Sequence, residues 1–473
     1  MAEQWLLLFA HVVLAPATAL HALLYKRDPR AAFGWIAVCI LLPLGGPVLY
    51  LLFGINRVRS HAARRVPRGF SPGFERGDAV VQPHPLPEDL SPLFLPLARV
   101  GAGLSRHRLL TGNRVEALYN GEGAYPPMLA AIRGATRRVY LSSYIFDTDR
   151  TGRAFVDALA DANARGVDVR VLVDGMGEWY SWPRVRRLLA RRRVRVARFM
   201  PLTLLPPSIH INMRKHHKLL VVDTTVAFTG GMNLGDRHLV EGEHRETGVA
   251  DVQFQVEGPA VAQLEDVFLQ LWSFTTGAPR TATGPAPEPC GEMRCRVITD
   301  GPDEDLDRLT MLLVAAISLA REELRIMTPY FLPPREIIAA LQGAAIRGVA
   351  VTLVLPATNN LPYMHWATRN MLWELLSRGV RVVYQPPPFV HSKLLVVDRH
   401  YALVGSANWD ARSLRLNFEL MLEIYDTALA GELSAHIDAA AANGEAVTLA
   451  QVDGRSLPVR LRDSVCWLFT PYL

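Results

Sequence analysis

The stretch His216-His217-Lys218-Leu219-Leu220-Val221-Val222-Asp223 recurs as His391-Ser392-Lys393-Leu394-Leu395-Val396-Val397-Asp398. Six residues then lead to Gly230-Gly231-Met232-Asn233 in the first copy and to Gly405-Ser406-Ala407-Asn408 in the second. Both copies read H-x-K-x4-D-x6-G-[GS]-x-N, with no slip in spacing. A duplicated set of His, Lys and Asn predicts a symmetric site for one phosphodiester, assembled from two halves of the chain.

Lysine is rare in this chain, and this makes its presence in both motifs informative. Only four lysines occur, so arginine supplies 51 − 4 = 47 of the basic residues. Two of the four, Lys218 and Lys393, stand at matched motif positions. Arginine would serve as well on a solvated face, so a retained lysine indicates a need for a compact, rotatable ammonium. The alternative is two similar strands with incidental polar residues.

Length and composition set broad limits on the protein. A chain of 473 residues predicts two or three structural units. A net charge of +6 fits an anionic partner, either a lipid headgroup, a phosphate ester or a nucleic acid, without choosing among them. The four cysteines are scattered and match neither a disulfide framework nor a zinc site, so we expect reduced thiols.

Two uncharged apolar runs occupy the N-terminal region, at 5–25 and 31–54. Each is long enough to cross a hydrocarbon core of about 30 Å, and we therefore predict two transmembrane helices. A signal peptide is an alternative for the first run, although Met1-Ala2-Glu3-Gln4 lacks its basic start. Buried core helices are an alternative for both runs. Pro43, Gly45, Gly46 and Pro47 would kink the second run, so a re-entrant or shallow hairpin is a further alternative.

Basic residues flank the apolar runs unequally. Three lie in the short connection, and five follow the second run: Lys26, Arg27 and Arg30, then Arg57, Arg59, Arg64, Arg65 and Arg68. Because cytoplasmic flanks are enriched in basic residues, this bias predicts a cytoplasmic C-terminal part, with both termini inside.

The two motifs lie in halves of the chain with the same order of strands and helices. Arg165-Gly166-Val167 and Arg347-Gly348-Val349 match at an offset of 182 residues, and the motif histidines match at 175, which indicates a diverged duplication. We expect an α/β protein of two sandwich halves packed face to face. The predicted divisions are a membrane anchor at 1–56, a juxtamembrane linker at 57–110, a first half at 111–278, a linker at 279–293 and a second half at 294–473.

The motif residues suit phosphoryl chemistry. In an extended segment, H-x-K places both side chains on one face, and the next four apolar residues can enter the core. One imidazole can attack phosphorus while the other protonates the leaving alkoxide, so one must start neutral and the other protonated. The lysines, Asn233 and Asn408 can hold the phosphate oxygens. We expect no metal, since the site supplies its own cations.

Further residues have weaker signals. Glu246 and Glu419 lie 13 and 11 residues beyond the motif asparagines, and they are candidates to orient the histidines, with surface salt bridges as the alternative. Asp223 and Asp398 are expected to bond backbone or a basic side chain. The arginine-rich stretch 184–195 fits either an anionic lipid or a solvated helix face.

The paired motifs resemble those of the phospholipase D superfamily. The stretches Pro43-Leu44-Gly45-Gly46-Pro47, Asn212-Met213-Arg214-Lys215, Thr328-Pro329-Tyr330-Phe331-Leu332-Pro333 and Cys466-Trp467-Leu468-Phe469-Thr470-Pro471-Tyr472-Leu473 narrow the likeness to bacterial cardiolipin synthases. The resemblance covers nearly the whole chain.

This resemblance implies two phospholipase D-like halves packed as a pseudo-dimer, and a multi-pass protein of the bacterial inner membrane with its catalytic part in the cytoplasm. It implies transfer of a phosphatidyl group between two phosphatidylglycerol molecules, with no cofactor, no metal and no nucleic acid. His216 would be the nucleophile and His391 the general acid and then base, and Lys218, Lys393, Asn233, Asn408 and Ser406 would bind the phosphate. The family also counts Asp223 and Asp398 within its active-site motif.

Two positions depart from the family pattern. Gly231 stands where the second copy has Ser406, and Glu246 stands where these synthases often carry aspartate. Three other functions stay open: a hydrolase with water as acceptor, a transferase that takes phosphatidylethanolamine as donor, and a non-catalytic membrane scaffold of the same fold. The sequence does not identify partner proteins.

Overall fold

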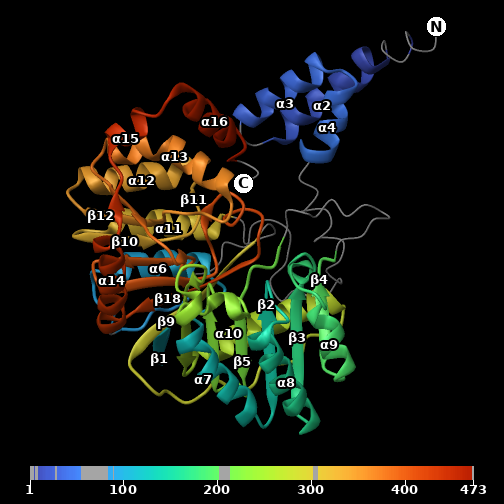
Figure 1. The fold of residues 1–473 in the computed structure, drawn as a ribbon, viewed down its shortest axis with the longest axis vertical. Coiled ribbons are helices and arrows are strands. Elements are labelled where there is room, and N and C mark those ends of the chain that lie inside the picture. The colour runs from blue at the N-terminus through green and yellow to red at the C-terminus, as the bar shows by residue number, and fades with distance from the viewer. Residues whose placement is uncertain are drawn as a thin grey trace. The chain divides into compact units, whose positions relative to one another are not determined.

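The computed structural model describes residues 5, 9–26, 29–54, 84–88, 90–201, 214–301 and 307–470. They belong to two compact units, 1–68 and 69–473, which we describe separately (Figure 1). Several residues used above lie outside the described part: Arg27, Arg57, Arg59, Arg64, Arg65, Arg68, Asn212, Met213, Pro471, Tyr472 and Leu473.

The N-terminal unit is helical. Its elements are η1 (Ala10–Leu14), α2 (Ala15–Tyr25), α3 (Pro29–Leu41), α4 (Gly45–Leu49) and η2 (Tyr50–Gly54). Tyr50 is buried, and its hydroxyl lies 2.8 Å from Nδ1 of His21. A Cβ on Gly46 would approach the carbonyl oxygen of Val38 to 2.2 Å, so glycine lets α4 begin close to α3. Much of the outer surface is apolar, with exposed leucine and phenylalanine side chains such as Leu24 and Phe33.

The helices of this unit are short. In the described part of the chain, no helix has both the length and the apolar character needed to cross a membrane. The second apolar run is broken between Leu41 and Gly45, where Pro43 lacks an amide hydrogen and disfavours helix in the residue before it. The structure therefore does not support the prediction of two transmembrane helices.

The larger unit is built on a 15-stranded sheet. From the centre outward, the first-half strands are β1 (Leu110–Tyr119), β8 (Val252–Glu257), β6 (Val226–Gly230), β5 (Leu219–Val222), β2 (Arg138–Ser143), β3 (Asp168–Asp174) and β4 (Arg195–Phe199). The second-half strands follow the same order: β9 (Met293–Asp300), β18 (Glu419–Tyr425), β16 (Tyr401–Gly405), β15 (Leu394–Val397), β10 (Glu323–Met327), β12 (Ala350–Pro356), β13 (Arg381–Gln385) and β19 (Glu445–Ala446).

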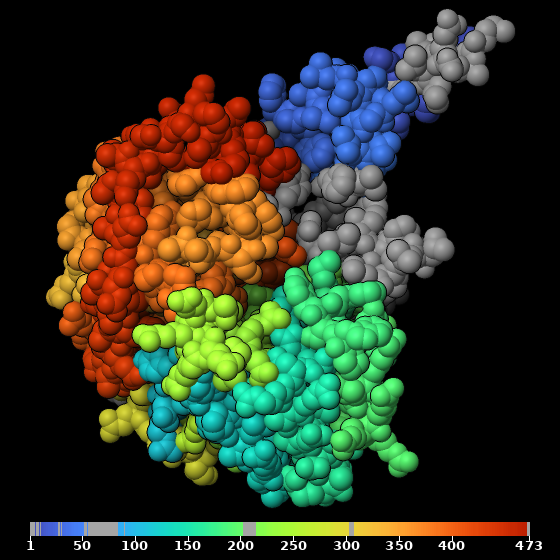
Figure 2. Space-filling view, viewed as in Figure 1, coloured from blue at the N-terminus to red at the C-terminus, as the bar shows by residue number. Residues whose placement is uncertain are grey.

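The two halves join through β1 and β9, which pair antiparallel at the centre of the sheet. The predicted α/β fold with two similar halves is confirmed, but the halves meet edge to edge rather than face to face. Two small pairs lie outside this sheet: β7 (Val249–Ala250) with β14 (Phe389–Val390), and β11 (Phe331–Leu332) with β17 (Trp409–Asp410). The lime-green segment that includes β7 lies against the orange second half in Figure 2.

Helices cover both faces of the sheet. On one face, α10 (Ala260–Thr276) and α14 (Thr427–Ala442) pack into a single core shared by both halves. The other face is covered in the first half by α7 (Asn120–Gly134), α8 (Arg150–Ala164) and α9 (Val185–Arg191). In the second half it is covered by α6 (Leu95–Leu104), α11 (Arg308–Leu319), α12 (Arg335–Ile346) and α13 (Pro362–Leu376), on which α15 (Leu449–Asp453) and α16 (Leu457–Leu468) pack. The remaining turns are η3 (Gly177–Tyr180), η4 (Asp236–His238) and η5 (Gly242–His244).

Helix α6 falls within the predicted linker 57–110, yet it is part of the second-half core. Both terminal nitrogens of the Arg296 guanidinium donate to the carbonyl oxygen of Ala98 at 3.2 Å, and its Nε donates to Glu423 at 2.6 Å. A Cβ on Gly101 would approach Arg296 to 1.9 Å, so glycine is needed where α6 crosses this buried ion pair. The structured part of the larger unit therefore starts before residue 110.

Candidate active site

The two motif histidines are held by backbone bonds to the opposite half. The amide of His216 donates to the carbonyl of Phe418 at 2.9 Å, and the amide of His391 donates to that of Ala250 at 2.7 Å. Phe418 and Ala250 occupy matching places, each directly before a residue with a carboxylate and a central strand of the sheet. The crossing places the residue after each of them beside a histidine of the other half.

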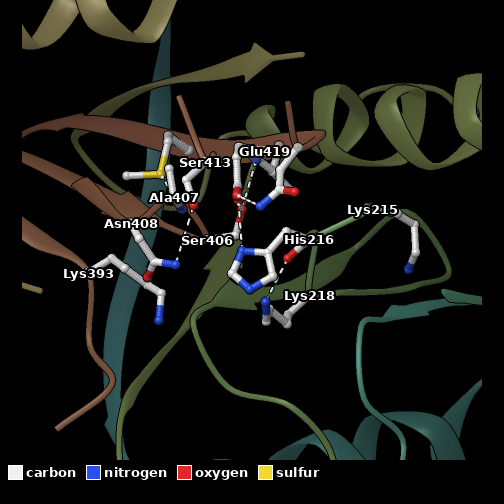
Figure 3. Close-up of polar contacts among 12 residues, drawn as sticks. Lys215, His216, Lys218, Lys393, Ser406, Ala407, Asn408, Ser413 and Glu419 are labelled. Atoms are coloured by element: carbon white, nitrogen blue, oxygen red, sulfur yellow. Dashed lines mark hydrogen bonds and ion pairs between the residues drawn. The ribbon is translucent and has the colours of Figure 1, made fainter. Parts of the chain in front are cut away.

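Those next residues are Glu419 and Asp251. Nδ1 of His216 lies 3.1 Å from Oε2 of Glu419, and Nδ1 of His391 lies 2.8 Å from Oδ2 of Asp251 (Figure 3). Glu419 was one predicted orienting residue, and it serves the histidine of the other half. The second, Glu246, is exposed on the loop after η5, and the structure places Asp251 where Glu246 was predicted to act.

Each motif lysine lies next to its histidine. Nζ of Lys218 donates to the carbonyl oxygen of His216 at 2.8 Å, and Nζ of Lys393 lies 3.1 Å from Nε2 of His391. Both ammonium groups are buried. Burial lowers the pKa of Lys218 well below its usual value, with further lowering by Lys393, and lowers that of Lys393 to about 8. Because two cations share a buried site, an anionic ligand between them would relieve their repulsion.

The glycine-rich tetrapeptides follow β6 and β16. Oδ1 of Asn233 accepts from the amide of Ile145 at 3.1 Å, and this fixes the side chain. Nδ2 of Asn408 donates to Ser413 at 3.3 Å, and Figure 3 shows Asn408 beside Lys393. A Cβ on Gly231 would approach Oδ1 of Asp251 to 2.6 Å, so glycine there leaves room for the aspartate. Its counterpart Ser406 instead donates to Glu419.

The two orienting carboxylates differ in acidity. Burial raises the pKa of Asp251, but the bond from His391 and the charge of Lys393 outweigh it and hold the pKa at about 2. Burial raises the pKa of Glu419 to about 7, against the lowering by Lys218 and by Ser406. Asp251 is therefore ionised at neutral pH, whereas Glu419 titrates there.

The empty site keeps both histidines neutral. Burial, Lys218 and Lys393 lower the pKa of His216 well below its usual value. Burial and Lys393 lower the pKa of His391 to about 3, although Asp251 acts in the opposite direction. The lysine contributions would be offset by a bound phosphodiester anion, so proton uptake by one histidine is coupled to substrate binding.

Asp223 and Asp398 lie away from the histidines. At about 3.3 Å per residue, the five steps from Lys218 put Asp223 about 16 Å along the strand. There its carboxylate accepts from the amides of Thr136, Arg137 and Arg138. Asp398 accepts in the same way from the amides of 321–323. Both aspartates thus fasten the far end of a buried motif strand.

Three residues near the site were not predicted to act there. Asp251 escaped because it lies 18 residues beyond Asn233, whereas Glu419 lies 11 beyond Asn408, so equal spacing pointed elsewhere. Tyr144 stands edge-on to His216, with ring centroids 5.3 Å apart. Nε2 of His238 accepts from the amide of Asn233 at 3.2 Å. The strand end at 143 and the third histidine were the sequence signals for the last two.

Two other groups near His216 behave differently from the motif residues. Lys215 is fully buried, and Figure 3 shows it pointing away from His216; its Nζ donates to Ser142 and to two backbone carbonyls. As for metals, no cluster of three or more His, Cys, Asp or Glu side chains among the described residues is arranged to hold an ion. The expectation of metal-free chemistry stays a prediction.

Comparison with known proteins agrees with this geometry. The family described as "Cardiolipin synthase, PLD-like domain" matches residues 128–272 and 313–440, which include both motifs. A second family, "Phospholipase_D-nuclease N-terminal", matches residues 5–54. The chain belongs to the cardiolipin synthase family of phospholipase D-like proteins. The resemblance seen in the sequence is thereby confirmed.

Full-length relatives support this membership. A cardiolipin synthase of Geobacillus kaustophilus is 30% identical, over 95% of this chain and 90% of that protein. The major cardiolipin synthase of Bacillus subtilis is 30% identical over 95% of both. Among solved structures, phosphatidylserine synthase of Haemophilus influenzae superposes with a TM-score of 0.62 over 80% of this chain and all of its own, at 16% identity. That likeness shows the fold alone.

Proposed function

We propose that this member of the family is a cardiolipin synthase that transfers a phosphatidyl group from one phosphatidylglycerol to another, giving cardiolipin and glycerol. The observation that carries the proposal is the crossed pairing of His216 with Glu419 and of His391 with Asp251. Each half supplies the carboxylate that the histidine of the other half needs, so the two motifs form one reaction centre. The cardiolipin synthase relatives supply the substrate class.

His216 is the proposed nucleophile. When Nδ1–H of His216 donates to Glu419, Nε2 carries the lone pair that can attack phosphorus. The raised pKa of Glu419 fits this role, because a weakly basic carboxylate leaves the imidazole neutral. The asymmetry between Glu419 and Asp251 therefore favours the assignment that the family resemblance implies.

His391 is the proposed general acid and then base. The ionised carboxylate of Asp251 stabilises an imidazolium on His391 once a substrate anion has offset Lys393. In the first step Nε2 of His216 bonds phosphorus, and the departing glycerol oxygen takes the proton of His391. In the second step the hydroxyl of another phosphatidylglycerol returns its proton to His391 and displaces His216. Lys218, Lys393, Asn233 and Asn408 hold the phosphate oxygens in both steps, and Ser406 acts through Glu419.

Product analysis tests the overall reaction. The full chain, purified in detergent, is incubated with phosphatidylglycerol, and its lipid products are measured by mass spectrometry. Cardiolipin with an equal amount of free glycerol is the expected result. Phosphatidic acid in place of cardiolipin would establish a hydrolase. Cardiolipin formed only after phosphatidylethanolamine is added would make that lipid the donor.

An adduct experiment tests which histidine attacks. We suggest a phosphatidyl ester of p-nitrophenol as donor, because this leaving group departs without a general acid. With His391→Asn, the adduct should form but persist, since no base activates the acceptor, and peptide mass spectrometry should locate it on His216. An adduct on a His216→Asn variant would reverse the assignment.

We also propose that residues 1–56 attach the protein to the bacterial inner membrane as a multi-pass anchor, with the catalytic part in the cytoplasm. The uncharged runs, the basic flanks and the apolar outer surface of the described helices support this. Protease protection in inverted and right-side-out vesicles tests the orientation. Digestion of the catalytic part only in right-side-out vesicles would contradict it.

A further inference from the structure

A short segment after β3 exposes three large aromatic side chains. Trp179 is 60% exposed, Tyr180 59% and Trp182 75%. We call these three residues the aromatic segment. The matching connection after β12, at 357–361, has no tryptophan, so this feature belongs to the first half alone. Exposed aromatic residues that gather in one segment mark a contact surface.

Arginine side chains surround the aromatic segment. The guanidinium of Arg184 lies 3.6 Å from the ring centre of Trp179, and that of Arg187 lies 5.1 Å from the ring centre of Trp182. Within the described chain, neither arginine has a carboxylate at ion-pair distance. Residues 177–193 hold six arginines and one acidic residue, Glu178, which is buried and paired with Arg186. The surface is therefore both aromatic and strongly positive.

The aromatic segment is fixed next to the His216 side of the reaction centre. Oδ1 of Asp174 accepts from the amide of Gly177 at 3.1 Å, and Oδ2 accepts from the amide of Lys215, directly before His216, at 3.0 Å. One carboxylate thus ties the segment to the motif.

The ring of Tyr144 bridges the remaining distance. Its centroid lies 6.5 Å from that of Tyr180 and 5.3 Å from that of His216. A Cβ on Gly177 would approach the carbonyl oxygen of Tyr144 to 1.7 Å, so glycine lets the segment pack this closely. A molecule that contacts the aromatic segment is therefore one ring away from the histidine.

The combination of side chains fits a lipid surface better than a nucleic acid. Tryptophan and tyrosine are enriched where a bilayer meets water, and arginine is attracted to anionic headgroups. Single-stranded nucleic acid would stack its bases on open aromatic faces. Here Arg184 already covers one face of Trp179.

We propose that the aromatic segment, with Arg184 and Arg187, binds the surface of an anionic phospholipid bilayer and that substrate lipid leaves the bilayer there to reach His216. The proposal rests on the proposed function only for the lipid nature of the substrate. It makes the first half the side from which phosphatidylglycerol enters.

Fluorescence tests the contact without any catalysis. The full chain is reconstituted in vesicles that contain brominated phosphatidylglycerol, which quenches nearby tryptophan. The contribution of Trp179 and Trp182 is the difference between wild type and the Trp179→Phe/Trp182→Phe variant. Trp373→Phe is the matched control, because Trp373 is half exposed on α13 of the second half. Stronger quenching for the pair than for Trp373 is expected, and an unquenched pair would overturn the proposal.

Kinetics test whether the contact serves substrate entry. Arg184→Gln/Arg187→Gln and Trp179→Ser/Trp182→Ser are assayed with phosphatidylglycerol in vesicles at a low mole fraction, and with monomeric dihexanoyl phosphatidylglycerol. The vesicle rate should fall by about fivefold for each arginine removed, and the monomer rate should stay unchanged. Equal losses on both substrates would overturn the proposal.

The two proposals fail in different ways. Quenched Trp179 and Trp182 in a wild-type protein that makes no cardiolipin would reject the proposed function and support the bilayer contact. Cardiolipin synthesis with an unquenched pair would do the reverse. Displacement of the bilayer by an oligonucleotide of thymidine would also overturn the lipid assignment.

Discussion

At the scale of residues, the two motif histidines bond carboxylates of different length and different acidity. Gly231 leaves space for the short Asp251, whereas Ser406 donates to the longer Glu419. The motif spacing predicted equivalent histidines, and it is these neighbours that make them unequal. The chemical roles therefore depend on residues that the repeated motif does not contain.

Replacing Asp251 tests the unexpected carboxylate. Asp251→Asn removes the charge that stabilises a protonated His391, so kcat should fall by roughly 10²–10⁴-fold, the usual contribution of a general acid. Glu246→Gln is the matched control, because Glu246 is exposed and was the residue predicted from spacing. A comparable loss with Glu246→Gln would contradict the role given to Asp251.

The pH dependence should report Glu419. Its pKa is raised to about 7, so it is protonated below that pH and can no longer accept from Nδ1–H of His216. The acid limb of kcat/KM should therefore lie near pH 7, with activity falling as pH decreases. The Ser406 hydroxyl lowers the pKa of Glu419, so Ser406→Ala should move this limb to higher pH. A shift to lower pH, or none, would exclude Glu419 as the titrating group.

At the scale of elements, the sequence identified the motif strands well and the connections poorly. The four apolar residues of each motif form β5 and β15, and every one is buried. Strand counting would have found Asp251, because it precedes β8 as Glu419 precedes β18. Counting residues failed because η4 and η5 lengthen the first-half connection, and loop length tolerates such changes.

The motif aspartates should matter for folding rather than for chemistry. Asp223 accepts from three amides and from the Thr136 hydroxyl, so Asp223→Ala should lower the free energy of unfolding by about 3 kcal/mol. Urea denaturation measures this change, and kcat at low temperature should stay within about twofold because the strand end lies far from the histidines. A large loss of kcat with unchanged stability would place Asp223 in the reaction instead.

At the scale of the whole molecule, the duplication was readable but the way its halves join was not. Patterns of apolar residues show that a strand is buried, and they do not show which strand of the other half it meets. The join consists of β1 beside β9 and of one core under α10 and α14. Membrane crossing was misjudged for a related reason, because an uncharged run fixes composition and Pro43 decides where the helix ends.

The join makes the two halves dependent on each other, and splitting the chain tests this. A break within 279–289, between α10 and β9, interrupts no strand or helix. Each fragment alone should lose at least about 10²-fold in activity, since it retains a histidine without its orienting carboxylate. Co-expressed fragments should copurify and recover activity, because the shared core and the β1–β9 pair rebuild Glu419 beside His216. Activity in the C-terminal fragment alone would mean that two copies of one half can form the centre, and the proposed division of roles between His216 and His391 would then be unnecessary.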